Sequence, residues 1–282
     1  PLRNVSFSLS TTQYSLLPAN LRGAQPPAGS PEYFVSLGSS TTLRQWKFGV
    51  NWAIPNNSTF TGPTNITVAS YTQPTFKIPQ SGSTEKLDSL GDRAMMQLQY
   101  RNLNGAESLW LTHTVSSNSV AALRWYEVRN PGGVPSVFQQ GTYQPDSLHR
   151  WMGSLAVDRQ GNLAIGFSAS SGSIFPAIRY AGRLAGDPAG QLTQGETTLV
   201  AGTGAQSGGF SRWGDYSALS VDPLDDCTFW YTTEYYETTG PDWQTRIGSF
   251  KFPGCTGGAT ATPPPPSPTP TRPPPATASR TV

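Results

Sequence analysis

The sequence has 282 residues, of which 36% are hydrophobic and 11% aromatic, so the chain can bury a large apolar core. Only 13% are charged, against roughly 25% in typical soluble domains. The net charge of +2 excludes the strongly basic surface expected of a protein that binds nucleic acid or an acidic membrane. No apolar run reaches about 18 residues, the length of a membrane-spanning helix.

The two cysteines and the composition predict a secreted protein. Low charge with many Ser, Thr, Gln and Asn is common in secreted and surface proteins of bacteria. Cys227 and Cys255 flank the last group of predicted strands, and an even count fits one disulfide in an oxidising compartment. Two free buried thiols are the alternative. The chain starts at Pro1 without a signal region, so we expect a mature, processed or partial chain that is extracellular or on the cell surface.

The first part of the chain predicts a strand, a loop and a group of short strands. Apolar and polar residues alternate over Asn4–Leu9, the pattern of a half-buried strand. Residues 11–31 are rich in Gly and Pro and predict a loop. The strands expected next are Glu32–Leu37, Leu43–Val50 and Asn65–Val68.

Three more groups of short strands follow, separated by turn residues. The second group comprises Arg93–Tyr100, Ser108–His113, Ala122–Val128 and Ser136–Gln140. The third comprises Arg150–Asp158, Leu163–Ser168, Ala177–Ala181 and Thr197–Ala201. The fourth, within Ser211–Phe252, has three strands. No stretch keeps a 3.6-residue period, so we expect almost no helix.

These groups recur in register. The first strands of the last three groups carry apolar pairs at matching positions: Leu98 and Tyr100, Leu155 and Val157, Leu219 and Val221. The third strands of all four groups each carry an arginine: Arg44, Arg124, Arg179 and Arg246. Turns at Asp158–Asn162 and Asp222–Asp226 occupy equivalent places between the first and second strands.

A repeat of four short strands is typical of a β-propeller blade. Residues 1–256 therefore predict a β-propeller of about four four-stranded blades, or part of a larger propeller; a β-sandwich is the alternative. We expect Asn4–Leu9 to supply the fourth strand of the last blade. Otherwise a partner chain, or blades that precede Pro1, would complete the ring.

Residues 257–282 predict an extended polyproline II tail, because prolines alternate there with Thr and Ser. A disordered linker or stalk is one interpretation, and a tail held by a neighbouring subunit is another. The candidate O-glycosylation sites are Thr262, Ser267, Thr269 and Thr271.

Metal and cofactor sites are not predicted. The chain has two histidines, His113 and His149, and neither has a ligand-spaced partner, which argues against a His-based metal site or a Ser-His-Asp triad. Acidic residues at Asp222–Asp226 offer oxygen ligands for calcium, but their spacing favours a solvated turn.

Arginine–tryptophan pairs mark the candidate ligand-binding positions. Arg with Trp suits a carboxylate or the face of a sugar, and in a propeller the start of an inner strand lies near the central channel. Pairing of each Arg with a neighbouring blade is the structural alternative. The candidates are Arg93, Arg150, Trp151, Arg212, Trp213 and Asp215.

A sialidase-like enzyme is a further alternative for the last group of strands. Asp215, Tyr216 and Glu234 with Tyr235–Tyr236 offer the carboxylates and tyrosines that such chemistry needs. However, repeats of the Ser-x-Asp-x-Gly-x-Thr-Trp type are not well formed, so the sequence favours no catalytic residue.

Several motifs resemble those of a family of uncharacterised secreted proteins from environmental bacteria. They are LDSLGDR (87–93), RWYEVRNPGG (124–133), YQPDS (143–147), RWGDYS (212–217) and DDCTFWYT (225–232). The resemblance covers most of residues 15–255, and the relatives look longer at the N-terminus. It implies a secreted propeller with sialidase-like architecture and supplies no catalytic residues.

The sequence thus favours an extracellular structural or adhesive module that forms cell-surface or filament assemblies. Assembly would use blade edges or the Pro-rich tail, by self-association or with a partner chain that supplies missing blades. The alternative is a carbohydrate-binding lectin or a sialidase-like glycoside hydrolase that binds glycans at the channel mouth.

Overall fold

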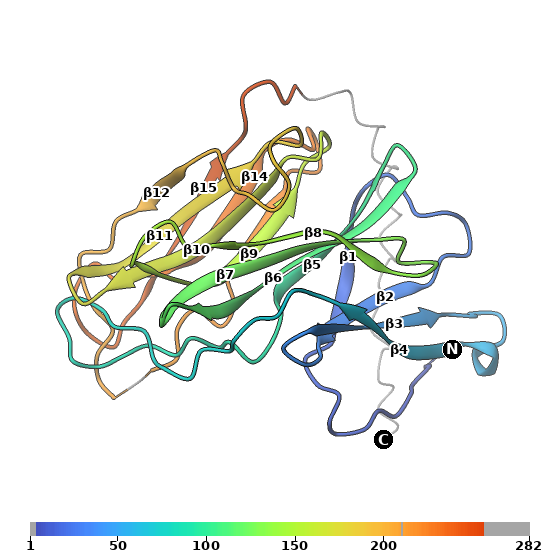
Figure 1. Cartoon of the computed structure of the whole chain (residues 1–282), viewed down its shortest axis with the longest axis horizontal. Helices are drawn as coiled ribbons and strands as arrows, with labels where there is room; N and C mark the ends of the chain where they lie inside the picture. The colour runs from blue at the N-terminus through green and yellow to red at the C-terminus, as the bar shows by residue number, and fades with distance from the viewer. Residues whose placement is uncertain (1–3, 210, 257–282) are drawn as a thin grey trace, which may run out of the picture.

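A computed structural model describes residues 4–209 and 211–256 (Figure 1). Regular structure there consists of β-strands and one short 3-10 helix, η1 (Pro55–Asn57). The prediction of an all-β chain with almost no helix is confirmed. Among the described residues, no helix has the length and apolar character needed to span a membrane.

The strands fall into four groups of consecutive strands, here called units 1 to 4. Unit 1 comprises β1 (Leu17–Gly23), β2 (Glu32–Leu37), β3 (Thr42–Gly49) and β4 (Thr59–Thr67). Unit 2 comprises β5 (Met95–Leu103), β6 (Ala106–Ser117), β7 (Val120–Arg129) and β8 (Ser136–Tyr143). Unit 3 comprises β9 (His149–Val157), β10 (Leu163–Ser171), β11 (Ile174–Arg183) and β12 (Glu196–Val200). Unit 4 comprises β13 (Ala218–Val221), β14 (Phe229–Tyr235) and β15 (Gln244–Phe250).

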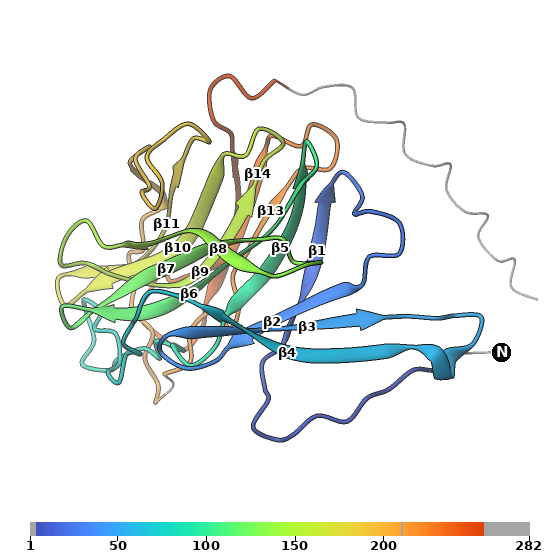
Figure 2. The ribbon, with the colours of Figure 1, turned by 45° about the vertical axis from the view of Figure 1, so that its right-hand side comes forward.

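Neighbouring strands within each unit are antiparallel, and units 1 and 2 share one sheet. The strand order of this eight-stranded sheet is β4-β3-β2-β1-β5-β6-β7-β8. Strand β1 joins the two units, because Leu17 and Pro18 pair with β2 while Ala19–Gly23 pair in parallel with β5. Figures 1 and 2 show β1–β4 at one side of the molecule and the later units at the other.

Successive units bury apolar side chains between them. One cluster joins Tyr33 and Val35 of unit 1 to Leu109 of unit 2. A second joins unit 2 to unit 3, and a third joins unit 3 to unit 4. Because unit 3 is covered on both faces, β9 and β10 are buried along nearly their whole length and lack the polar–apolar alternation of a half-buried strand.

The first strands of units 2, 3 and 4 are joined through polar side chains. Gln99 of β5 donates to the Val157 carbonyl of β9 and accepts from its N–H. Ser154 of β9 accepts from the Leu219 N–H of β13, and Gln97 of β5 donates to the Leu219 carbonyl. The apolar pairs that defined the repeat are buried in these strands, as expected: Leu98 and Tyr100, Leu155 and Val157, Leu219 and Val221.

Two N-terminal segments differ from the prediction. Leu17–Gly23, expected as a loop, is strand β1, whose apolar residues pack against the core between units 1 and 2. Residues 4–9, expected as a strand, form none. Instead Phe7 packs on Phe48 and Phe60 of unit 1, with ring centroids 6.0 and 5.9 Å apart. The expectation that this segment completes the last unit is therefore wrong.

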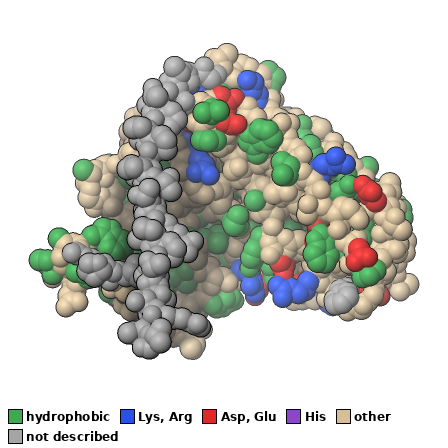
Figure 3. Space-filling model, turned by 180° about the vertical axis from the view of Figure 1, so that it is seen from behind, with side chains coloured by type: hydrophobic (Ala, Val, Ile, Leu, Met, Phe, Trp, Pro, Cys, Tyr) green, Lys and Arg blue, Asp and Glu red, His purple; other side chains and the backbone are tan. Residues whose placement is uncertain are grey.

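The predicted disulfide is present between Cys227 and Cys255. It ties the turn before β14 to the segment after β15. The Pro-rich tail and the candidate glycosylation sites Thr262, Ser267, Thr269 and Thr271 lie outside the described residues. On the face seen in Figure 3, charged side chains are scattered among uncharged ones, in keeping with the low charge content.

Candidate functional site

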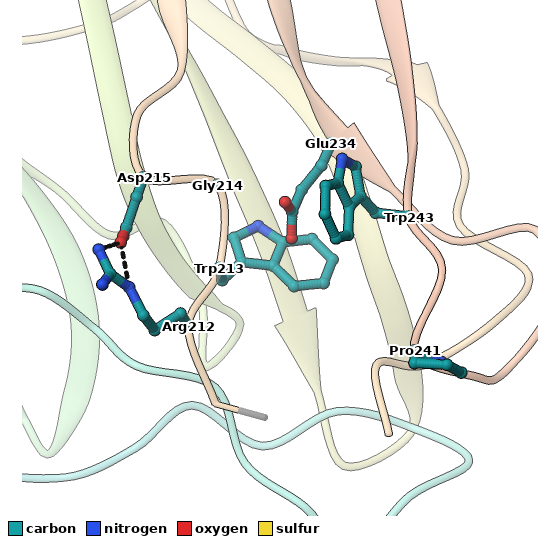
Figure 4. A pocket seen from close by; sticks show the side chains of 7 residues that line it. All are labelled: Arg212, Trp213, Gly214, Asp215, Glu234, Pro241 and Trp243. Atoms are coloured by element: carbon teal, nitrogen blue, oxygen red, sulfur yellow. Dashed lines mark hydrogen bonds and ion pairs between the residues drawn. The ribbon is translucent and has the colours of Figure 1, made fainter. Parts of the chain in front are cut away.

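A pocket of about 460 Å³ in unit 4 brings together three of the predicted ligand-binding residues (Figure 4). It is formed by the segment before β13, the end of β14 and the loop before β15. Its lining residues are Arg212, Trp213, Gly214, Asp215, Glu234, Pro241 and Trp243.

The segment that leads into β13 is held in place by unit 3. Trp213 is buried, and its Nε1 donates to Ser168 Oγ of β10 at 2.9 Å. Its ring lies 5.8 Å from that of Trp151 in β9 and 5.5 Å from that of Tyr236. Ser217 Oγ donates to the Met152 carbonyl at 2.7 Å. These contacts give the pocket a fixed floor from which Asp215 projects.

Asp215 and Arg212 form an ion pair at the rim of the pocket. The Arg212 Nε donates to Asp215 Oδ2 at 2.6 Å, and Nη2 donates to the same oxygen. The Arg212 side chain is 82% exposed, whereas that of Asp215 is 16% exposed. The second oxygen, Oδ1, is buried and has no hydrogen-bond partner among the described residues. Asp215 therefore keeps an unused acceptor.

Glu234 is the second carboxyl group of the pocket. In β14 the buried residues alternate with Trp230, Thr232 and Glu234, which lie on the other face of the sheet. Burial raises the pKa of Glu234 to about 7, the charge of Asp215 adds to this rise, and a hydrogen bond from the Gly214 backbone opposes it. Oε1 of Glu234 is buried and likewise has no partner in the described chain. Glu234 can therefore hold or release a proton near neutral pH.

Trp243 supplies an exposed aromatic wall. It is 62% exposed and lies two residues before Thr245, the β15 partner of Glu234. Figure 4 shows the Glu234 carboxyl between the rings of Trp213 and Trp243. An open aromatic face beside polar acceptors is an arrangement that suits a ring with both apolar faces and hydroxyl groups.

The remaining predicted ligand-binding residues lie elsewhere. Arg150 is buried and pairs with Asp146 and Glu196 at 2.8 and 2.7 Å, and Trp151 is fully buried behind Trp213. Arg93 pairs with Asp92, and its Nη1 reaches the hydroxyl of Tyr216 at 3.4 Å. None of these three lines the pocket.

Sequence reasoning missed Trp243 and Pro241 and left Glu234 outside the ligand-binding set. The available signal was weak: Trp243 continues the alternation of Thr245 and Ile247 on one face of β15. Glu234 lies beside that face because of the register between β14 and β15. This register cannot be read from the sequence.

The acidic turn of unit 4 uses its carboxylates internally. Asp222 accepts from the Leu224 N–H, and Asp225 accepts from the N–H groups of Cys227 and Thr228. Asp226 pairs with Arg101. Across residues 4–209 and 211–256, no group of three or more His, Cys, Asp or Glu side chains is placed to hold a metal ion.

Comparison with known proteins adds only distant likeness. No family model matches the sequence, and no curated protein matches it. Among solved structures, an endo-arabinase from Bacteroides thetaiotaomicron is similar over 88% of this chain and 97% of that chain, with 12% sequence identity and a TM-score of 0.25. Two proteins that share a fold superpose much better than this, so no argument below rests on this likeness.

Proposed function

We propose that the pocket of unit 4 binds a carbohydrate and that Glu234 and Asp215 hydrolyse a glycosidic bond in it. The observation that carries the proposal is the pair of carboxyl groups beside the open ring of Trp243, each with a buried oxygen that has no partner within residues 4–209 and 211–256. Buried acceptors without partners are rare in proteins. Sugar hydroxyl groups would donate to them while the sugar ring stacks on Trp243.

The two carboxyl groups suit the two roles of a glycoside hydrolase. Glu234, with its raised pKa, is protonated for part of the time at neutral pH and serves as the general acid. It gives its proton to the leaving oxygen as the glycosidic C–O bond breaks. Asp215, paired with Arg212, accepts a proton from the water whose oxygen forms the new bond to the anomeric carbon.

We further propose that the four units are blades of a β-propeller. In support, their strands are consecutive antiparallel meanders, the first strands of units 2, 3 and 4 lie side by side, and the units pack face to face. In such an arrangement the segment before β13 lies at one end of the inner strands, where propellers bind ligands.

The test uses the full chain with a panel of oligosaccharides and polysaccharides. We expect the chain to bind at least one glycan and to release reducing ends from it. Glu234→Gln and Asp215→Asn should abolish release while keeping binding within a few fold. Binding without release by the unmodified chain would reject hydrolysis and leave a lectin, and absence of binding across the panel would reject the carbohydrate site.

Trp243→Ala tests the stacking contact, and Trp230→Ala is its matched control. We expect Trp243→Ala to weaken binding about three- to tenfold, the value of one aromatic stacking contact. Trp230→Ala removes another exposed tryptophan from the same sheet, but Trp230 does not line the pocket and its Nε1 donates to Asp222. Equal losses in the two variants would contradict a saccharide stacked on Trp243.

A structural or adhesive module, which the sequence favours, is the second candidate function. Its support is the outer edge of β15. Units 1 to 3 each have a fourth strand beside the third, whereas β15 pairs within the described chain only with β14. Ile247 of β15 is also 68% exposed. An open edge of this kind accepts a strand from another chain.

The edge proposal is tested by sedimentation of the full chain over a wide concentration range. We expect association that grows with concentration and that Ile247→Lys suppresses, since an edge lysine blocks strand addition. Val134→Lys is the charge-matched control, because Val134 is exposed and lies between β7 and β8, far from β15 in the sequence. A monomer at every concentration would reject assembly through this edge.

A further inference from the structure

Arg183, the last residue of β11, is a buried cation without an ionic partner among the described residues. Its side chain lies in the interior, with the residue 3% exposed. Nη2 donates to the backbone carbonyls of Asp187 and Ala185 at 2.6 and 3.5 Å. Nε is buried and has no hydrogen-bond partner among the residues that the structure describes. This guanidinium therefore has donors to spare.

The nearby carboxylates are already engaged by other groups. Glu127 accepts from Arg129 Nε and from Gln139 Nε2, both at 2.6 Å. Asp187 accepts from the Leu184 N–H and from two side chains of its own loop. Arg183 itself forms an ion pair with neither, nor with any other described residue.

An unpaired buried guanidinium is costly. Burial lowers the pKa of Arg183, and the more distant charges of Asp187 and Glu127 only partly offset this. Arginine does not lose its proton in proteins. The charge therefore remains, and its desolvation destabilises the folded chain unless an anion compensates it. Buried charges are normally paired for this reason.

The pocket that Arg183 lines has room for such an anion. Its volume is about 340 Å³, and it lies between units 2 and 3, beside the turn that follows β9. A second guanidinium, that of Arg129, lies on its wall and stacks 3.2 Å above the ring of Phe138. Gln160 adds an amide, and Trp110 adds an apolar surface. The pocket of Glu234 is lined by Trp213, whose ring packs on Trp151 near the start of β9. The pocket of Arg183 lies beyond the end of β9, so the two pockets are at opposite ends of that strand.

We propose that this pocket binds a small oxyanion, either sulfate or the carboxylate of an acidic sugar, through Arg183. The planar guanidinium offers parallel N–H donors that match two oxygens of such a group. Arg129 and Glu127 lie on the same wall and pair with each other at 2.6 Å, so Arg183 is the cation left to hold the anion. The inference does not rest on hydrolysis at Glu234, because no residue is shared between the two pockets.

The test measures thermal unfolding and calorimetric binding of the full chain with sulfate, glucuronate, glucose and chloride at matched ionic strength. We expect the melting temperature to rise and saturate with sulfate or glucuronate, but not with glucose or chloride, because a ligand stabilises the state it binds. A stronger response to glucuronate would identify the acidic sugar, and a stronger response to sulfate the inorganic ion.

Arg183→Met should remove the saturable rise and weaken binding at least about tenfold. It should also leave the anion-free melting temperature equal or higher, since an apolar side chain replaces an uncompensated charge. Arg44→Met is the control: Arg44 lies in β3, donates to Gln13 and lines neither pocket. Arg183→Lys keeps the charge but lacks the parallel N–H donors of the guanidinium, so it should bind the anion at an intermediate level. An unmodified chain without a saturable response, or an equal response in Arg183→Met, would overturn the proposal.

Discussion

Arg101 and Asp226, 125 residues apart, form a two-pronged ion pair that joins unit 2 to unit 4. Nη1 and Nη2 of Arg101 reach the two oxygens of Asp226 at 2.9 and 2.7 Å. Nε of the same guanidinium donates to the Val157 carbonyl of β9 at 2.7 Å. One buried side chain in β5 thus contacts the end of β9, the first strand of unit 3, and the β13–β14 turn of unit 4.

Loss of this pair should destabilise the whole stack of units. Arg101→Ala leaves the Asp226 carboxylate, which is 17% exposed, without its partner, and removal of one member of a buried pair costs about 3–5 kcal/mol. The partial exposure of Asp226 favours the lower end of this range. The free energy of unfolding in urea is the measurement.

Lys251→Ala is the control for the ion pair. Lys251 follows β15, and its Nζ lies 4.0 Å from Asp225, the neighbour of Asp226. Both side chains are partly exposed, so loss of this ion pair should cost less than about 1 kcal/mol. Similar costs for the two variants would show that the Arg101 pair contributes no more than a surface pair.

Close contact between units 3 and 4 depends on residue 166 being glycine, which has no Cβ. A Cβ there would lie 2.6 Å from the ring of Tyr231, which fills the space above β10. Gly166→Ala should therefore force the two sheets apart and cost about 1–3 kcal/mol. Gly172→Ala, at a turn where a Cβ meets nothing within 4 Å, should change the unfolding free energy little. A neutral Gly166→Ala would mean that Tyr231 moves freely.

The sequence was informative where the pattern depends on burial. Leu155 and Val157 recur in register with Leu219 and Val221 because each pair is buried in the first strand of a unit. The arginines Arg44, Arg124, Arg179 and Arg246 all lie in third strands, where one end of the side chain stays near solvent. The Asp158–Asn162 turn was visible because Asp158 accepts from the N–H groups of Gln160 and Asn162.

Pairing between distant segments was not visible in the sequence. Strand β1 carries Pro18 and ends at Gly23, two residues typical of loops. Its partner β5 lies 79 residues further along the chain, as the pairing of Ala19 with Leu98 shows. Residues 4–9 alternate like a strand, yet Phe7 finds an aromatic surface on unit 1 instead of a neighbouring strand. Local pattern fixes which residues prefer burial but does not choose their partner.

The same limit applies to the candidate site. Asp215 and Trp213 could be selected because Arg-Trp recurs, but Arg150 and Trp151 carry the same motif and are buried in the structure. Only the packing of the segment before β13 against β14 and the loop before β15 places Glu234 and Trp243 beside one pocket.

The disulfide should contribute substantially to the stability of unit 4. Cys227 and Cys255 are 28 residues apart in sequence. Closing a loop of that length lowers the entropy of the unfolded state, which raises its free energy by about 3–4 kcal/mol at room temperature. Cys227→Ala with Cys255→Ala should lower the unfolding free energy by about this amount in guanidinium. The unmodified chain in strong reductant should match the double variant. Equal midpoints with and without reductant would contradict a stabilising role.

Glu234 should make stability fall as pH rises. Its pKa is about 7 in the folded chain, against about 4.3 when unfolded. Between these values the folded state holds a proton that the unfolded state has lost, so unfolding releases it and becomes easier at higher pH. The stabilisation is complete below about pH 4 and is lost as pH rises to about 7, by up to about 4 kcal/mol.

Glu234→Gln should remove this slope, because glutamine does not titrate, and should be more stable than the unmodified chain at pH 8. Unfolding free energies at a series of pH values give the comparison. Glu237→Gln, the same change at an exposed position three residues later, should leave the slope in place. The hydrolytic rate should decline as pH rises through about 7, the pKa of Glu234 in the folded chain, since the general acid must carry its proton. A rate that rises through pH 7 would instead assign Glu234 the role of a base, and an unchanged slope in Glu234→Gln would show that another group titrates there.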